Sequence, residues 1–332
     1  MPRPPRVQIP ADVDNATLTV EGKDVRLTNL RKPFWPERGI TKGGLIRYYV
    51  EVSAALLPHV QGRPATRKRW PEGVEQASFF VKDLQPGTPP WLGRAQIRHR
   101  SGPKFYPVFD TPAALGWLGQ VAALELHVPQ WRIKQPAGPT SVTNRSDERF
   151  PDRVVFDLDP GPGAGLAECV DVALALRERL GPLGQRIVPV SSGSKGLHLY
   201  VPLDDPITSS QASEWARLAA EELEKALPTL VVSRMAKSLR PDKVLVDWSQ
   251  NNRSKTTIAP YSLRGRETPT VAAPRRGRNC LSQVCGTWTI GRFSTGSPTV
   301  WTPFSISIAS PLHWPRLPAT PRPGYRGGQQ SG

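Results

Sequence analysis

The chain has 332 residues, enough for one large domain or two smaller ones with a substantial core. Lysine and arginine number 44 against 28 acidic residues, and the formal net charge of +16 favours a polyanionic partner, nucleic acid before an anionic membrane surface. The sequence shows no signal peptide, no apolar run that could span a membrane and no disulfide or zinc spacing among three cysteines, so we expect a cytoplasmic protein with chemically idle thiols.

The first elements in chain order are an arm, a hairpin and two helices. Residues 1–17 are rich in proline and are expected to form a flexible N-terminal arm, and residues 18–27 predict a hairpin that turns between Glu21 and Asp24. Apolar residues at helical spacing predict a helix over 41–57, with Thr41 as its cap. The segment LGWLGQVAALEL predicts a second helix over 115–126.

The second half of the chain interleaves strands and helices. The segment VVFDLDPG at 154–161 predicts a buried strand that ends at Pro-Gly, and a helix over 165–180 follows it directly. The remaining expected elements are a serine-capped helix over 209–227 and strands over 105–109, 186–190, 197–201 and 244–247. No regular βαβ repeat and no dinucleotide or P-loop motif occurs, so a mixed α/β or α+β catalytic domain is predicted.

Two acids that are separated by a single residue on an apolar strand suggest a metal-binding site. Asp157 and Asp159 share one face of the strand, where they would repel each other and lose hydration unless a cation lay between them. Asp247 ends a second apolar strand, and three such acids would suit a two-metal site for nucleotidyl transfer. Turn-capping or arginine-paired aspartates remain the alternative reading.

Two further segments are typical of phosphate or nucleic-acid binding. In SSGSKGLHLYV, small residues let backbone N–H groups approach phosphate and Lys195 supplies charge, although a plain hairpin loop is the alternative. Dense cations over 63–71 near Phe79 and Phe80 fit a groove that follows a nucleic-acid strand, with a buried phenylalanine pair as the alternative. Cations on either side of Asp247 fit phosphate contacts or a solvated surface.

Together these segments resemble a known family. The sequences RPATRKRWPEGVEQASFFVK, LELHVPQWR, VVFDLDPG, SSGSKGLHLYVPL and VLVDWSQNNRSKTTIAPYSLRGR are similar to the polymerase domain of bacterial DNA ligase D, in the archaeo-eukaryotic primase superfamily. The similarity runs from about residue 25 to about residue 274 and implies an α+β primase-like core, a largely antiparallel sheet flanked by helices. A catalytic domain over 18–274 is therefore expected.

The resemblance also implies roles for individual residues. Asp157, Asp159 and Asp247 would be the catalytic ligands of Mn²⁺ or Mg²⁺, with Asp247 also assisting the primer 3′-hydroxyl. The nucleotide would be bound by His127, Ser192, Lys195, His198, Arg240, Gln250 and Arg264. DNA would be bound by Asn29, Lys32, Lys42, Lys68, Phe79 and Phe80, of which Lys32 and Lys42 would grip a 5′-phosphate and the phenylalanines would stack near the template base.

The implied activity is that of a metal-dependent nucleotidyltransferase of the EC 2.7.7 type. It would add NTP or dNTP substrates, with ribonucleotides preferred, to primer 3′ ends at gaps and double-strand breaks, in bacterial end joining or repair. Ku and a separate ATP-dependent DNA ligase are the implied protein partners, and the nucleoid is the expected location. The alternative is a non-catalytic protein that binds and bridges DNA ends; the intact Asp157, Asp159, Asp247 and Lys195 argue against it.

The sequence departs from the family pattern in two ways. No ligase or phosphoesterase motif follows, which suggests a stand-alone polymerase or an isolated domain. After Arg276 the sequence becomes rich in Ser, Thr, Pro and Trp, where the family continues with an acidic helix-forming W-x-E-L pattern. We expect a poorly ordered tail over 275–332. Our hypothesis is a reading-frame change near Arg276, which resequencing the gene would test.

Overall fold

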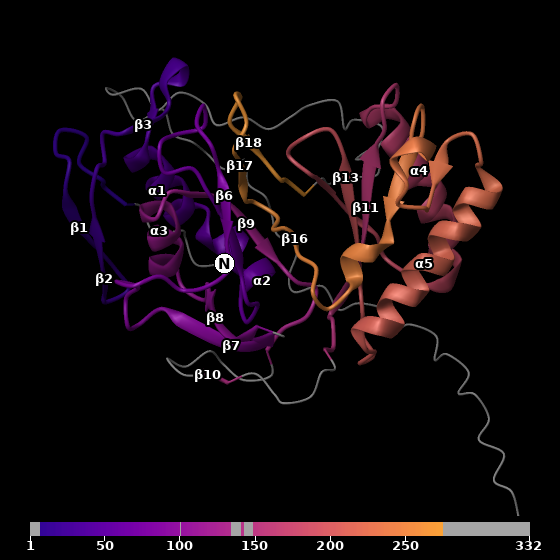
Figure 1. Cartoon of the computed structure of the whole chain (residues 1–332), viewed down its shortest axis with the longest axis horizontal. Helices are drawn as coiled ribbons and strands as arrows, with labels where there is room; N and C mark the ends of the chain where they lie inside the picture. The colour runs from indigo at the N-terminus through magenta and orange to yellow at the C-terminus, as the bar shows by residue number, and fades with distance from the viewer. Residues whose placement is uncertain (1–6, 100, 134–140, 143–148, 275–332) are drawn as a thin grey trace, which may run out of the picture.

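The polypeptide forms two lobes, each with its own sheet and hydrophobic core (Figure 1). This computed structural model describes residues 7–99, 101–133, 141–142 and 149–274. Sequence predictions for residues 1–6 and for the tail over 275–332, including the frame-change hypothesis, lie outside the described residues. Within 7–17, Ile9 is buried and belongs to the first core.

The first lobe contains three helices and most of the short strands. Its helices are α1 (Lys42–Glu51), α2 (Ser53–Val60) and α3 (Pro112–Gln120), with a 3-10 turn over Pro36–Arg38. Its strands are β1 (Ala16–Val20), β2 (Lys23–Leu27), β3 (Pro33–Trp35), β4 (Ile40–Thr41), β5 (Thr66–Arg69), β6 (Phe79–Val81), β7 (Gly93–His99), β8 (Gly102–Val108), β9 (Ala123–Val128) and β10 (Ser141–Val142). A four-stranded antiparallel sheet in the order β16-β9-β5-β6 forms its centre, where β16 is Thr257–Ile258.

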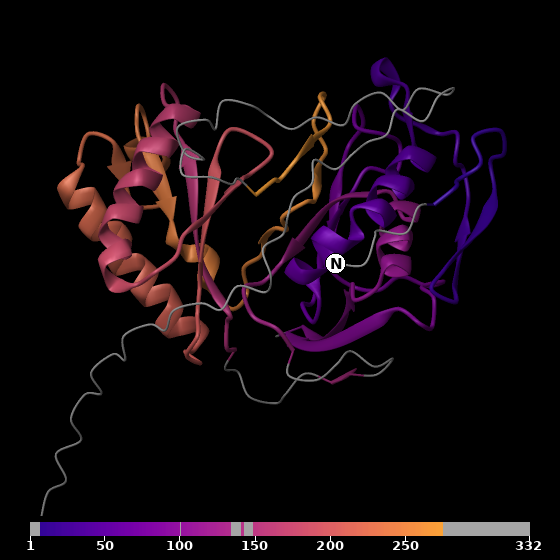
Figure 2. The same cartoon turned by 180° about the vertical axis from the view of Figure 1, so that it is seen from behind.

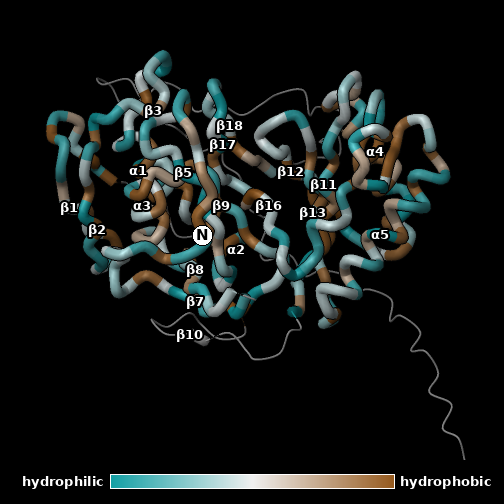
Figure 3. Tube along the Cα trace, viewed as in Figure 1, coloured by the Kyte–Doolittle hydropathy of each residue, from teal (hydrophilic) through white to brown (hydrophobic). Residues whose placement is uncertain are grey.

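Close contact between α1 and α3 builds the first core. A methyl group on Gly119 would lie 2.9 Å from Ile46 Cα, so glycine lets the two helices approach closely. Leu45 and Ile46 of α1 and Leu115 and Leu118 of α3 are fully buried in this core. Figure 3 shows the hydrophobic residues gathered along these helices.

The second lobe is a five-stranded sheet covered by two helices. Its sheet has the order β12-β13-β11-β15-β14 and is antiparallel except for the β14–β15 pair. The strands are β11 (Arg153–Pro160), β12 (Val188–Ser191), β13 (Leu197–Pro202), β14 (Val231–Val232) and β15 (Val244–Asp247). The helices are α4 (Leu166–Leu180) and α5 (Ser209–Ala226), with 3-10 turns over Gly181–Leu183, Lys237–Leu239 and Trp248–Asn251.

Side-chain alternation along β11 separates the core from the opposite face of the sheet. Val154, Phe156 and Leu158 are fully buried beneath α4 and α5, whereas Asp157 and Asp159 lie on the other face and are partly exposed. After β15 the chain returns to the first lobe through β16, β17 (Leu263–Arg264) and β18 (Thr270–Val271). Figures 1 and 2 both show this segment running between the two lobes.

The expected fold class is confirmed: the sheets are largely antiparallel and are flanked by helices. The hairpin over 18–27, Thr41 as a helix cap and the strand ending at Asp247 are also confirmed. The Thr41 hydroxyl accepts a hydrogen bond from Gly44 N at 3.4 Å. The helix predicted over 41–57 divides at Val52 into α1 and α2.

Two predictions of helix boundaries were wrong. Residues 115–126 are not one helix, because α3 ends at Gln120, Ala122 has a φ of 58° and β9 begins at Ala123. The helix end and the strand are both buried, so the apolar run contains no change of pattern that separates them. The cap of α5 is Thr208 rather than a serine: its hydroxyl accepts from Gln211 N, and Gln211 Oε1 accepts from Thr208 N.

Candidate active site

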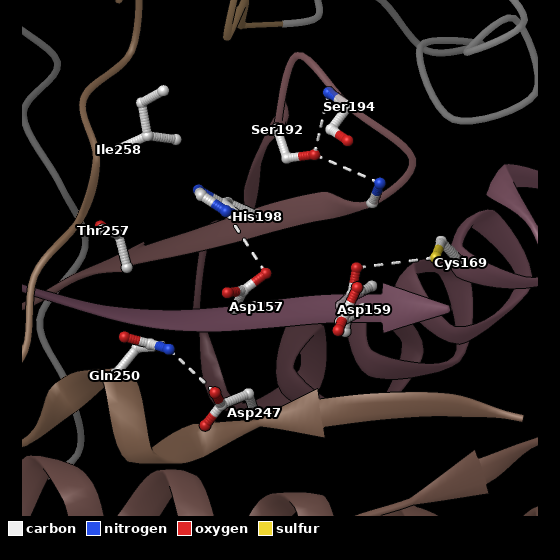
Figure 4. Close-up of polar contacts among 12 residues, drawn as sticks. Asp157, Asp159, Cys169, Ser192, Ser194, His198, Asp247, Gln250, Thr257 and Ile258 are labelled. Carbon is white, nitrogen blue, oxygen red and sulfur yellow. Dashed lines mark hydrogen bonds and ion pairs between the residues drawn. The ribbon is translucent and has the colours of Figure 1, made fainter. Parts of the chain in front are cut away.

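Strand register brings the three predicted acids to one face of the second sheet (Figure 4). Asp157 on β11 lies directly opposite Asp247 on β15, and on its other side it lies opposite His198 on β13. Directly opposed residues have Cβ atoms about 4.5–5.5 Å apart. Asp159 follows two residues along the same face of β11, so acids from two strands gather at one place.

Each acid is engaged by a polar group of the protein. Asp157 Oδ1 lies 3.3 Å from His198 Nε2, and Asp159 lies 3.8 Å from Lys195 Nζ and 3.7 Å from Arg240 Nη1. Burial and the neighbouring charges of Asp157 and Asp247 raise the pKa of Asp159, against the opposing effect of Lys195 and Arg240. Burial is the largest of these causes, and the charge of Asp157 adds the repulsion that the D-x-D spacing predicts.

Asp247 is oriented by the residues that follow it. Its Oδ1 accepts from Ser249 Oγ at 2.6 Å and from Ser249 N at 3.0 Å, and its Oδ2 accepts from Gln250 Nε2 at 2.8 Å. Across the described ranges, no group of three or more His, Cys, Asp or Glu side chains is arranged to hold a metal ion. Carboxylate oxygens are nevertheless the donors that Mg²⁺ and Mn²⁺ prefer, so the donor set fits such an ion, which would compete with Ser249 and Gln250 for Asp247.

The loop between β12 and β13 lies against the acid-bearing end of β11. Ser192 Oγ accepts from Ser194 N at 3.3 Å and from Gly196 N at 3.2 Å, which folds the loop back on itself. Lys195 Nζ donates to Pro160 O at 2.8 Å. A methyl group on Gly196 would lie 2.3 Å from Leu158 O, so only glycine permits this contact. The loop therefore places Lys195 beside Asp159.

A cavity of about 320 Å³ opens over this face of the sheet. It is lined by most of the residues predicted to bind metal or nucleotide: His127, Asp157, Asp159, Ser192, Lys195, His198, Gln250 and Arg264. Of the remaining two, Asp247 adjoins the cavity through Gln250, and Arg240 through its ion pair with Asp159. The cavity thus gathers predicted residues from both lobes.

Sequence reasoning missed several residues at this cavity. Ser194, Thr257 and Arg266 also line it, and Arg266 Nη2 donates to Ser194 Oγ at 2.8 Å. The Glu125 carboxylate contacts both His127 and Arg264, two of the residues that line the cavity. The alternation of LELHV could have indicated a strand with Glu125 and His127 on one face, but the helix predicted over 115–126 concealed it.

The residues predicted to bind DNA form two groups in the first lobe. In the first group, Lys68 on β5 pairs across the sheet with Phe80 on β6, and the Lys68 ammonium lies 5.5 Å from the centre of that ring. The Phe80 ring lies edge-on to His127, with centroids 5.5 Å apart, so this group adjoins the cavity. Phe79 and Phe80 are 47% and 57% exposed and are not a buried pair.

The second group contains Asn29, Lys32 and Lys42 at the start of α1. Asn29 adopts a φ of 56°, and its carbonyl accepts from Lys32 N at 3.1 Å. The Lys42 ammonium is buried and donates to Thr28 O at 2.7 Å. Burial and the nearby charges of Lys32 and Arg69 lower the pKa of Lys42 to about 8. Lysine and arginine side chains therefore gather at this position, where Lys32 also pairs with Glu72.

Comparisons with known proteins agree over most of the chain. A family model described as the LigD primase-polymerase domain matches residues 41–290. The multifunctional non-homologous end joining DNA repair protein LigD of Mycobacterium tuberculosis is 54% identical over 254 residues, which cover 76% of this chain and 32% of that protein. The bifunctional non-homologous end joining protein LigD of Bacillus subtilis is 33% identical over 251 residues, covering 75% of this chain and 38% of that protein. The chain thus spans about a third of the length of these relatives.

A solved structure is also similar. The polymerase domain from Mycobacterium tuberculosis Ligase D, in complex with DNA, matches with a TM-score of 0.74 and 50% sequence identity. The match covers 81% of this chain and 91% of the solved chain. Among the helices of the described ranges, none is both long enough and apolar enough to cross a membrane.

Proposed function

This chain belongs to the LigD primase-polymerase family, and on that premise we propose that it is a metal-dependent nucleotidyltransferase acting at DNA ends. It would add nucleotides, ribonucleotides in preference, to primer 3′ ends at gaps and double-strand breaks. The observation that carries the proposal is the strand register that sets Asp157 opposite Asp247, with Asp159 beside the lysine-bearing loop.

The three acids would bind the metal ions, and the loop between β12 and β13 would bind the triphosphate. Asp157, Asp159 and Asp247 would hold Mg²⁺ or Mn²⁺, which when bound would activate the attacking hydroxyl and neutralise the triphosphate. Lys195 and Arg240, both beside Asp159, would neutralise phosphate oxygens, and Ser192, whose hydroxyl accepts from Ser194 N and Gly196 N, would keep the loop that carries Lys195 in place. Gln250 would hold the orientation of Asp247 beside the primer terminus.

The two groups of the first lobe would bind the DNA. Lys32, Lys42 and Asn29 would hold the 5′-phosphate of a recessed or gapped end, because the phosphate would meet two lysine ammonium groups there. Lys68, Phe79 and Phe80 would contact the template strand next to the cavity, where exposed rings can stack on unpaired bases. The solved relative is a complex with DNA, which supports this assignment.

The protein partners are proposed from the relatives alone. The curated relatives are end joining proteins, and the match to this chain covers 32% of the length of the one from Mycobacterium tuberculosis. We propose Ku and an ATP-dependent DNA ligase as partners at the break.

Primer extension tests the proposed activity. Gapped and overhanging substrates with 5′-phosphates are supplied with Mn²⁺ and each nucleotide type, and the wild type should extend them with NTPs faster than with dNTPs. Asp159→Ala should yield no product, because it removes a metal ligand and the partner of Lys195 and Arg240. Asp171→Ala, at an exposed position on α4, is the matched control and should extend normally.

The outcomes separate the two candidate functions. A wild type that binds ends but yields no product with any nucleotide or metal would favour the non-catalytic bridging protein. Equal rates with NTPs and dNTPs would contradict only the ribonucleotide preference, and full activity in chelator would contradict the metal dependence.

A further inference from the structure

Glu125 is more deeply buried than the other acidic residues that the structure describes. Among the residues that the structure describes, it is the one Asp or Glu in the buried class, at 4% exposure. It lies on β9, two residues before His127, and the register of the sheet sets it opposite Lys68 on β5. A buried carboxylate costs several kcal/mol unless cations and donors surround it, so its surroundings explain its presence.

Both carboxylate oxygens of Glu125 are occupied by groups at the edge of the nucleotide cavity. Oε2 lies 2.9 Å from His127 Nε2 and 3.5 Å from Arg264 Nη1, and Oε1 accepts from Gly265 N at 3.3 Å. Glu125 thus joins β9 to β17 and contacts two residues that line the cavity.

The charge state of Glu125 decides the proton position on His127. Burial raises the pKa of Glu125, but the hydrogen bond from His127 and the charge of Arg264 outweigh it, and the net pKa is lowered. The carboxylate is therefore ionised and can only accept, so His127 Nε2 must be the donor. Burial, together with the charges of Arg264 and Lys68, outweighs the opposing effect of Glu125, so the pKa of His127 is lowered and the ring is neutral. Its Nδ1 then carries no proton and is an acceptor.

We propose that Glu125 is a positioning residue for the nucleotide: it fixes the tautomer of His127 and holds Arg264 against the cavity. The proposal rests on the proposed function and adds a chemical constraint to it. An unprotonated Nδ1 cannot donate to a phosphate oxygen, so His127 receives a hydroxyl or amino donor of the nucleotide. Phosphate contacts are left to Lys195, Arg240 and the Ser192 loop.

Loss of the carboxylate has a specific consequence for Arg264. The other acid whose charge acts on the Arg264 guanidinium is Asp157, a proposed metal ligand. Without Glu125, Arg264 is drawn toward Asp157, and His127 loses the partner that selects its tautomer. Both changes weaken nucleotide binding at the site itself.

Glu125→Gln tests the proposal, with Glu222→Gln at an exposed position on α5 as the matched control. The ¹⁵N resonances of the His127 ring, assigned with His127→Asn, should show an unprotonated Nδ1 in the wild type and a mixture of tautomers in Glu125→Gln. The KM for nucleotide should rise roughly tenfold with a smaller change in kcat, the size of one lost charge-assisted hydrogen bond. Glu125→Asp keeps the charge on a shorter side chain. Its KM and its mixture of His127 tautomers should therefore lie between those of the wild type and those of Glu125→Gln.

The results that would overturn the proposal are distinct. If Glu125→Gln folds and keeps the wild-type ring resonances and KM, Glu125 contributes only to packing. If the KM falls, Glu125 opposes nucleotide binding. If Glu125→Gln does not fold, wild-type resonances and KM in Glu125→Asp overturn the proposal instead. A wild type that extends no primer contradicts the proposed function, whereas the ring resonances still report on the Glu125–His127 pair.

Discussion

Lys32, a proposed ligand of the 5′-phosphate, already has an anionic partner. Its ammonium lies 2.6 Å from Glu72 Oε2, in the turn that follows β5. Backbone contacts hold that turn against β3, since Val74 N donates to Phe34 O at 3.1 Å and a methyl group on Gly73 would lie 3.1 Å from Pro33 O. An incoming phosphate would therefore have to compete with Glu72 for the Lys32 ammonium.

Glu72→Gln should increase the affinity for 5′-phosphorylated ends by about threefold, because an exposed ion pair of about 0.2–1 kcal/mol no longer has to be broken. Ends that carry a 5′-hydroxyl should gain less, since only the phosphate reaches Lys32. Fluorescence anisotropy with the two kinds of end measures the difference. Glu75→Gln, an exposed acid three residues further on, is the control, and an equal gain there or on hydroxyl ends would show only a general charge effect.

At the scale of elements, the β17–β18 hairpin supports the loop between β12 and β13. Gly193 in that loop has a φ of 67°, and a methyl group there would lie 2.7 Å from Arg264 Cγ and 2.9 Å from the Val271 carbonyl carbon. Thr270 Oγ1 donates to Gly193 O, and Arg266 reaches Ser194. The loop and the hairpin therefore fit together through a backbone contact that only glycine allows.

Gly193→Ala should push the loop off the hairpin and raise the KM for nucleotide roughly tenfold, a loss of about 1.4 kcal/mol in binding. Gly184→Ala is a close control, because Gly184 has a φ of 74° but no atom within 4 Å of the added methyl group. It should carry the backbone strain of about 1 kcal/mol without the change in KM. Matching KM values in the two variants would contradict the role of the contact.

The elements that carry the acids could be predicted from the sequence because each is a short apolar run that ends in a distinct polar signal. The strands ending near Asp159 and at Asp247 are confirmed on that basis. Their register could not be predicted, because the pairing of Asp157 with Asp247 depends on strands far apart in the chain. Glu125 was missed for a related reason: a continuous apolar run hid the change from helix to strand at Ala122.

At the scale of the molecule, a network of charges joins the two lobes. Arg63, only 1% exposed, donates through Nη2 to both oxygens of Asp152 at 2.5 and 2.6 Å, and Arg132 Nε donates to Asp152 Oδ2 at 2.7 Å. Arg63 and Arg132 belong to the first lobe, and Asp152 immediately precedes β11 of the second. The net positive charge of the chain predicted an anionic partner, but nothing in the composition indicated this junction.

Asp152→Asn should destabilise the protein by roughly 1–2 kcal/mol at neutral pH, because it leaves the buried Arg63 without its counter-charge, while solvent contact at the Asp152 carboxylate screens part of the effect. Although burial opposes it, the charges of Arg63 and Arg153 hold the pKa of Asp152 well below its usual range. The carboxylate therefore contributes stability above the ordinary aspartate pKa of 3.8, and this contribution declines as the pH falls below that value.

Denaturant titrations of the wild type and the variant at pH 7 and near pH 3 measure this effect. The gap between their unfolding free energies should narrow at the lower pH. Asp171→Asn, exposed on α4, should show no such gap at either pH. A gap that stays constant with pH would mean that shape rather than charge holds the junction.

The position of this junction on β11 has a mechanical consequence. Asp152 and Asp159 lie near opposite ends of β11, about 23 Å apart at about 3.3 Å per residue, and β11 is paired with β13 and β15, so a rotation at the Arg63–Asp152 junction would move the whole second sheet relative to the first lobe. A rocking of about 5° at the junction swings the far carboxylate by about 2 Å, roughly one metal–oxygen bond length. We therefore expect the stiffness of the Arg63–Asp152 junction to limit how far the three acids of the second sheet move relative to His127 and Arg264 of the first lobe.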